Sequence, residues 1–224
     1  MVPLRYNAGM KHLLKRFGLL CCLAVLAHAQ TRSVVLTWTA SASGAERYNI
    51  FRLAIPCPAG GAQPTWSVTP LLTTALSATT ATDATALIGT TYCYAGTALD
   101  AFGNQSVFSN TSQAVVTPYA PSLTSTQGAG SVVLTIVEPA APTLNPPGVT
   151  HNIYRATGLC SGSPVFSKIA TGLSVATFTD STVTGGPYCY QGTDTFNGLE
   201  GSAGAAITVT VPPAPPTNFG NTVP

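Results

Sequence analysis

The chain has 224 residues, of which 45% are hydrophobic and only 7% are charged, and the formal net charge is +2. The low charge and high apolar content exclude a solvated, disordered chain. The many β-branched residues and turn formers favour short strands over helices, and the length suffices for one large or two modest domains.

Residues 1–29 differ from the rest and predict a secretory signal peptide. Lys11, Lys15 and Arg16 precede an uncharged apolar run over residues 17–27, and Ala27-His28-Ala29 fits a small-x-small cleavage site before Gln30. This is the order of a signal peptide. A membrane anchor is the weaker alternative, because the run is about half the ~20 apolar residues that a spanning helix needs.

Removal of the signal peptide changes both the charge and the cysteine count. Four of the nine basic residues precede Gln30, so five remain against seven acidic residues, a net charge of about −2. No basic patch remains to bind nucleic acid, and no membrane span is expected. The remaining cysteines are Cys57, Cys93, Cys160 and Cys189. An even number in an exported chain predicts disulfides, with three possible connectivities.

From residue 33 onward, one series of predicted strands occurs twice. A first strand is followed by a second strand with a cysteine five positions after its arginine, a Thr-Asp turn, a Tyr-Cys-Tyr strand, an aspartate turn and a closing strand. The paired segments are 33–39 and 131–137, 48–52 and 151–155, 82–83 and 179–180, 92–94 and 188–190, 100–104 and 194–198, and 113–117 and 206–211. The period has the size of a small domain. The sequence therefore predicts an all-β fold of two antiparallel β-sandwiches, over residues 30–118 and 119–212, followed by a proline-rich tail over 213–224.

The first copy resembles a fibronectin type III domain of the bacterial extracellular kind. The residues that carry this resemblance are Val34-x-Leu36-x-Trp38, Tyr48-Asn49-Ile50-Phe51-Arg52, Thr82-Asp83, Gly89-Thr90-Thr91-Tyr92-x-Tyr94 and Asp100-x-x-Gly103-Asn104. The second copy is similar, with Ile136 in place of the tryptophan. The resemblance implies an immunoglobulin-like sandwich with Tyr92 and Tyr188 as corner tyrosines. A true immunoglobulin domain would need a cysteine on the early strand, and residues 33–39 have none.

Antiparallel pairing of the second strand with the Tyr-Cys-Tyr strand predicts the disulfides. The end of the strand at Arg52 then lies beside the start of the strand at Tyr92, so Cys57 can fold back to Cys93. By the same argument Cys160 pairs with Cys189. Because side chains alternate along a strand, Tyr92 and Tyr94 face the core and the cysteine between them faces out.

No catalytic, metal or cofactor site is predicted. His151 takes the place of Tyr48 and is interpreted as a strand residue, because a lone histidine lacks the partners that catalysis needs. Asp83 and Asp180 share one repeat position, and Asp100 and Asp194 share another, so all four are interpreted as turn formers. The acids are spread singly, which argues against a calcium site.

Trp66 and Tyr119 are the two candidate ligand-binding residues, because exposed aromatic rings can stack on sugars. Packing of Trp66 on the edge of the sandwich is the favoured interpretation. Asn104 and Asn110 lie in matches to glycosylation acceptors, which arise easily by chance in so Ser/Thr-rich a chain. The sequence predicts a secreted or cell-surface module, bacterial extracellular or periplasmic, for adhesion, spacing or protein–protein interaction. An accessory carbohydrate-binding module is the alternative, so the expected partner is a surface protein or a polysaccharide.

The first copy lacks a strand that the second copy has. Residues 121–126 can form a strand before 131–137, whereas only Gln30-Thr31-Arg32 precede the matching strand of the first copy. A bare sheet edge invites strand addition. We hypothesise self-association in which residues 215–223, from Pro215 to Val223, cover this edge in a second molecule or after bending back. A disordered proline-rich tail is the alternative.

Overall fold

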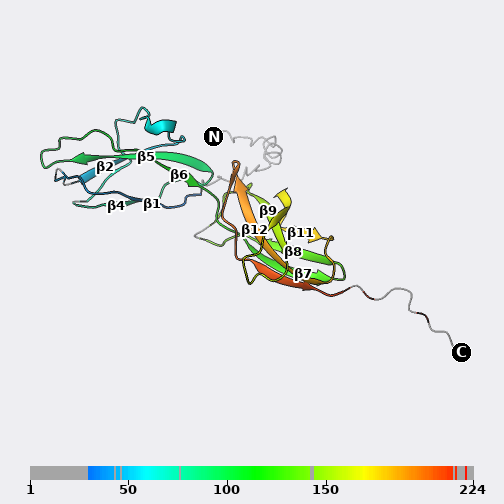
Figure 1. Ribbon diagram of the computed structural model, residues 1–224. Helices are drawn as coiled ribbons and strands as arrows, with labels where there is room; N and C mark the ends of the chain where they lie inside the picture. Colours follow the sequence, from blue (N-terminus) through cyan, green and yellow to red (C-terminus); the bar gives the residue numbers. More distant parts are fainter. Residues whose placement is uncertain are drawn as a thin grey trace, which may run out of the picture.

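The computed structural model describes residues 30–42, 44–45, 47–75, 77–141, 144–213, 215 and 220. In these residues the strands form two units, each with two antiparallel sheets (Figure 1). No helix in this described part of the chain is long and apolar enough to cross a membrane. The expected signal peptide, and most of the tail expected to form a strand, lie outside the described residues.

The first unit contains six strands and one 3-10 turn. The strands are β1 (Val34–Thr37), β2 (Arg47–Leu53), β3 (Leu72–Thr73), β4 (Thr80–Asp83), β5 (Thr90–Leu99) and β6 (Ser112–Val116), and the turn is Ala59–Gly61. β1 pairs with β4 in a two-stranded sheet, and β3, β2, β5 and β6 form a four-stranded sheet in that order.

The second unit repeats this arrangement and, among the described residues, adds two strands, β7 and the two-residue β13. Its strands are β7 (Ser122–Gly128), β8 (Ser131–Val137), β9 (Thr150–Thr157), β10 (Ser167–Leu173), β11 (Thr177–Asp180), β12 (Gly186–Phe196), β13 (Leu199–Glu200) and β14 (Ile207–Val211). The small sheet has the order β11-β8-β7, and the large sheet places β10, β9 and β12 side by side with β13 and β14 beyond β12. The predicted all-β fold of two antiparallel sandwiches is confirmed.

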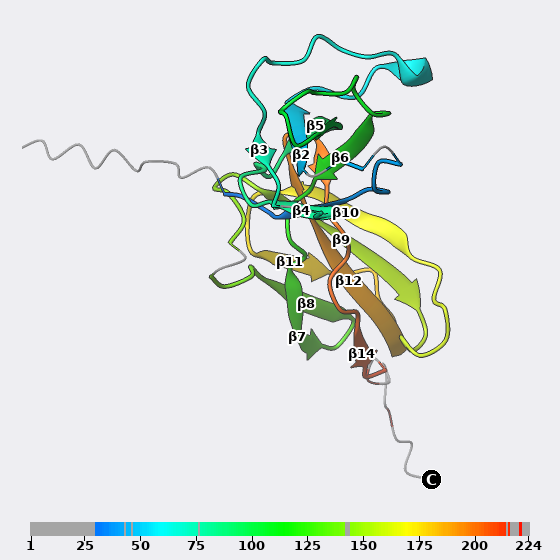
Figure 2. The ribbon, with the colours of Figure 1, turned by 90° about the vertical axis from the view of Figure 1, so that its left-hand side faces the viewer.

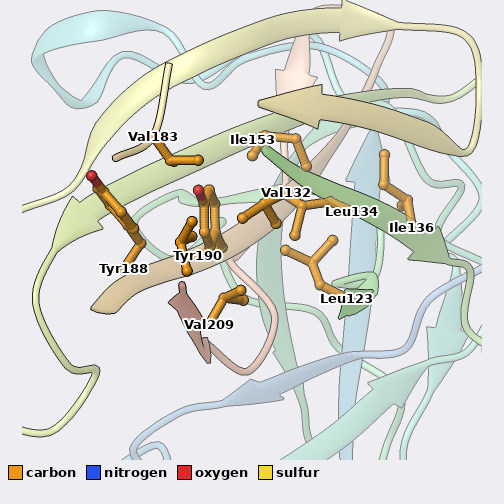
Figure 3. Close-up of a cluster of buried hydrophobic side chains, with 10 residues drawn as sticks. Leu123, Val132, Leu134, Ile136, Ile153, Val183, Tyr188, Tyr190 and Val209 are labelled. Carbon is orange, nitrogen blue, oxygen red and sulfur yellow. The ribbon is translucent and has the colours of Figure 1, made fainter. Parts of the chain in front are cut away.

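Alternation along the strands builds the core of each unit. In β8, Val132, Leu134 and Ile136 are buried, and the residues between them are more exposed. They meet Tyr190 and Val209 of the facing sheet (Figure 3). A period of two sends one side-chain set to each face of a strand, so the run of 131–137 supplies one apolar face to the core.

Both predicted corner tyrosines close a turn at the start of a long strand. The hydroxyl of Tyr92 accepts a hydrogen bond from the backbone N–H of Leu87 at 3.1 Å, and Tyr188 accepts one from Thr184 at 3.0 Å. A bond to the backbone a few residues upstream is the geometry of a tyrosine corner.

An aspartate ties the two sheets together in each unit. One carboxylate oxygen of Asp83 on β4 accepts bonds from the backbone N–H and hydroxyl of Thr85, as expected for a turn former. The other oxygen accepts bonds from Arg52 at 2.6 Å and Tyr94 at 2.8 Å, both on the large sheet. Burial raises the pKa of Asp83, but the bonds from Thr85, Tyr94 and Arg52 outweigh burial and hold that pKa below its ordinary value.

The second unit repeats this network residue for residue. Asp180 on β11 accepts bonds from Thr182, from Arg155 at 2.7 Å and from Tyr190 at 2.9 Å. Burial together with the bond to Asp180 raises the pKa of Tyr190. The Arg–Asp–Tyr network is therefore a property of the repeat rather than of one unit.

The structure joins Cys57 to Cys93 and Cys160 to Cys189, the two predicted pairings, with Cα–Cα distances of 4.8 and 5.0 Å. Cys93 and Cys189 are fully buried, on the face of β5 and β12 opposite to the core tyrosines. Each bridge therefore fixes the loop that follows β2 or β9 to the outer face of the large sheet.

Candidate functional site: an uncovered groove in the first unit

A groove of about 520 Å³ opens between the two sheets of the first unit. Its walls are Leu36 and Trp38 at the end of the small sheet, and Tyr48, Tyr94 and Gly96 on the large sheet. The ring of Trp38 packs edge-on against Tyr48 at 5.3 Å between centroids. The walls are mainly apolar, so a partner that covered them would bury apolar surface, which favours binding.

The same place in the second unit is filled by β7 and the proline before it. Gly96 pairs with Ile50, and Gly192 pairs with Ile153, so the two glycines are equivalent. A Cβ added to Gly192 would lie 3.3 Å from Leu123 and 3.4 Å from Pro121. At Gly96 it would meet only the neighbouring strand β2, at 3.6 Å. The groove is thus the space that a first strand occupies in the complete unit.

The edge of β1 beside the groove has no strand partner among the described residues. β8 pairs with β11 on one side and β7 on the other, whereas β1 pairs with β4 alone. Before β1 the chain runs alongside the loop after β4, where Thr31 bridges Leu87. A free edge presents unpaired backbone N–H and C=O groups to any extended chain.

Without a described strand equivalent to β7, the small sheet of the first unit is less buried than that of the second unit. Val34, Leu36 and Trp38 are only half-buried, whereas Val132 and Leu134 have no exposed surface. The indole Nε1 of Trp38 is buried without a hydrogen-bond partner in the described structure. Buried donors in native proteins are nearly always paired, so this wall of the groove is incomplete.

Trp66 lies on the outer face of the large sheet rather than on its edge. Its ring stacks on Phe108 at 5.4 Å and lies 6.5 Å from Phe51 of β2, and its indole N–H donates to Gln63 at 2.9 Å. A cavity of about 440 Å³ borders the cluster. The favoured interpretation was packing of Trp66 on the edge of the sandwich; the ring does pack on the protein, but against Phe51 and Phe108 on the outer face of the large sheet.

Tyr119, the other candidate, lies in the connection between the units. Its half-buried ring packs against the first core, beneath the Arg32 guanidinium at 4.8 Å. Its backbone N–H and C=O bond to the side chain of Asn145 at 2.7 and 3.1 Å. Tyr119 therefore joins the two units, and these contacts use its ring and backbone. The structure does not bring it together with Trp66 in one cluster.

The interpretation of Asp194 as a turn former is wrong. Asp194 lies within β12, is fully buried, and accepts a hydrogen bond from His151 Nδ1 at 2.8 Å and from Asn145 at 2.7 Å. Glu138 lies 3.3 Å from the same His151 nitrogen. The interpretation of His151 as a histidine without partners, among acids spread singly, is therefore also wrong.

The error came from the alignment of the two copies. Asp194 stands opposite His151, whereas the residue opposite Tyr48 is Ala98. Asp194 is therefore equivalent to Ala98, and the turn of the second unit is shorter than the sequence match implied. Asp100 does cap its turn, since it accepts bonds from the backbone N–H groups of Phe102 and Asn104.

Glu138, His151 and Asp194 place ligand atoms within 4.8 Å of one another, as a metal site requires. However, Asn145 donates to both carboxylates, at 2.9 and 2.7 Å, and also holds the backbone of Tyr119. Burial raises the pKa of Asp194 to about 6, opposed by the bond from His151 and reinforced by Glu138. The cluster is best described as a hydrogen-bonded network that holds the connection between the units through Asn145.

No protein-family model matches the chain, and a search of curated proteins finds no match. Among solved structures, a segment of two fibronectin type III domains from chicken tenascin has a TM-score of 0.49 and 12% identity, covering 81% of this chain and 94% of that one. The chicken interferon gamma receptor alpha chain has a TM-score of 0.46 and 13% identity, covering 82% and 97%. The FN1–FN3 domains of chicken CNTN1 have a TM-score of 0.35 and 11% identity, covering 85% and 65%. By its own strand order and corner tyrosines, the chain is a tandem of two fibronectin type III-like β-sandwiches.

Proposed function

We propose that the protein is an exported, non-catalytic interaction module for adhesion, spacing or protein–protein contact, and that its first unit binds partners by accepting an extended strand along β1. The observation that carries this proposal is the apolar groove of about 520 Å³ beside an edge without a partner among the described strands. In strand addition, backbone hydrogen bonds supply affinity and pockets for alternate side chains supply specificity. Two disulfides support export, because such bonds persist in oxidising compartments.

A peptide with the sequence of residues 121–128 is the probe for this function, because β7 and Pro121 fill the equivalent place in the second unit. We expect the fluorescently labelled peptide to bind the protein and to slow hydrogen exchange at the amides of β1. Absence of both effects would overturn the proposed function.

Two variants that each add three carbon atoms locate the binding site. Gly96→Val adds them inside the groove, where only ordinary contacts surround the new Cβ. Ala101→Leu adds them in the exposed turn after β5. We expect the first variant to lower peptide affinity about tenfold or more, which corresponds to ~1.4 kcal/mol, and the second to leave it unchanged.

Carbohydrate binding is the second candidate and would fall to Trp66, which borders a cavity of about 440 Å³. It ranks lower because the ring already stacks on Phe108 and its N–H is already bonded to Gln63. Retention on insoluble polysaccharide separates the two functions. Retention that is lost in Trp66→Ala would favour the carbohydrate module, and no retention of the parent protein would favour the interaction module.

A further inference from the structure

We infer that the strand that fills the groove is residues 216–223 of a second copy, so that molecules join head to tail. This inference rests on the proposed function and names its partner. It combines the groove with a segment that follows the last strand of the second unit and lies directly after Pro215, as β7 lies directly after Pro121.

The groove and the end of β14, from which the segment continues along the chain, lie at opposite ends of the described structure. β14 ends at Val211, which pairs with Gly186 at the start of β12. The other end of β12 carries Phe196, which packs against the core of the first unit. Figure 2 likewise shows β14 at the end of the molecule away from β2 and β5.

The distance excludes closure within one molecule. β12 has 11 residues and, at ~3.3 Å per residue, spans ~36 Å between the two ends. Only residues 212–215 separate Val211 from the segment, and four residues reach at most ~14 Å. The segment can therefore cover a groove only in another copy.

The chemistry of the segment suits the groove. Pro216 opens it and Pro215 precedes it; a proline disfavours helix in the residue before it, and its missing N–H is tolerated at the start of a strand. Phe219 is its one aromatic side chain and can take the place that Leu123 takes against Gly192 in the second unit. The backbone carbonyls of an added strand also offer an acceptor to the unpaired Nε1 of Trp38.

Here the tail of one copy binds a different surface, the groove, on the next copy. Such a heterologous interface does not close on itself as the interface of a two-fold dimer does. Each molecule in the assembly offers one groove and one tail. The expected product is an open series of oligomers whose mean size grows with protein concentration.

The test is sedimentation of the chain beginning at Gln30 over a range of concentrations. We expect the parent protein to form the oligomer series, and both a variant lacking residues 216–224 and the Gly96→Val variant to be monomers. An equimolar mixture of these two variants should give a dimer and nothing larger, because it contains one intact groove and one intact tail per pair. A monomeric mixture, or continued assembly without the tail, would overturn the inference.

Two further measurements keep failure of the inference distinct from failure of the proposed function. If the 121–128 peptide binds the groove while the parent chain stays monomeric, the groove accepts a strand from another partner and the self-assembly inference is wrong. Phe219→Asp should abolish assembly and Phe219→Leu should retain it, whereas equal assembly by both would exclude insertion of this side chain.

Discussion

The two units share the main strands of the large sheet, a corner tyrosine, an aspartate network and a disulfide, and they differ chiefly in β7. Where β7 covers the second unit, Val132 and Leu134 are fully buried. In the first unit the described residues include no such strand, and Val34 and Leu36 stay half-exposed. The comparison shows that the shared bonds are present in the same geometry without the third strand of the small sheet. The third strand is needed to close the core.

Removal of a disulfide should have the largest effect and should be similar in the two units. The bridges close loops with sequence separations of 36 and 29 residues. In the chain-entropy model each contributes about 4 kcal/mol. Cys57→Ser with Cys93→Ser, and separately Cys160→Ser with Cys189→Ser, test this by denaturant unfolding. Both tryptophans lie in the first unit, so their fluorescence follows that unit alone and circular dichroism follows both.

A core truncation should distinguish the covered unit from the uncovered one. Leu134→Ala is expected to cost about 3 kcal/mol, because the side chain is fully buried beneath β7. Leu36→Ala at the matching position should cost about 1 kcal/mol, because that side chain already faces the groove. Equal costs in dilute, monomeric protein would contradict the view that only the second core is closed.

Loss of the aspartate network should again affect the two units alike. Asp83→Ala and Asp180→Ala each leave a tyrosine hydroxyl and an arginine without their shared acceptor. We expect each to cost about 2 kcal/mol, since the arginines keep some contact with water. Thr85→Val and Thr182→Val remove only the hydroxyl bond and are the milder controls. A large difference between the units would show that the network depends on the third strand after all.

The smallest expected effect belongs to Asp194, which has no acidic counterpart in the first unit. Its pKa is raised to about 6 in the folded state, so between about pH 4 and 6 the folded protein binds more protons than the unfolded one. The free energy of unfolding of the second unit should therefore rise, on the order of 1 kcal/mol, as the pH falls through this window. Below it, protonation of Asp83 and Asp180, whose pKa values are lowered, should reverse the trend. Thermal unfolding of Asp194→Asn should show a flatter profile, with Asp100→Asn as the control in an exposed turn.

The sequence sufficed for the features that repeat. Alternation in 33–39 and 131–137 predicted the small-sheet strands, and the cysteine spacing predicted both disulfides. The Arg–Asp–Tyr network was not predicted, although its residues recur in the repeat. Which side chains meet across two sheets depends on the distance and twist between the sheets, which a pattern along one strand does not contain.

The features that do not repeat were harder to predict. Asp194 was matched to Asp100 because both precede an aromatic residue by two positions, and only the register of β12 against β9 placed it opposite His151. The lack of a second partner for β1 among the described strands was predicted from the few residues that would remain before β1 after removal of the expected signal peptide. The groove beside β1 required coordinates, because its volume depends on how far the two sheets stand apart.

The disulfides have a mechanical consequence for molecules joined end to end. If tension unfolds one unit, the loop closed by its disulfide cannot be pulled out, because the bridge carries the force past it. The loop between Cys57 and Cys93 has a sequence separation of 36 residues, and that between Cys160 and Cys189 has one of 29. At ~3.5 Å per extended residue, roughly 130 and 100 Å of contour remain locked in the two loops. In a stretched series of joined molecules, the gain in length from each unfolded unit would therefore be smaller under oxidising conditions than after reduction of the disulfides.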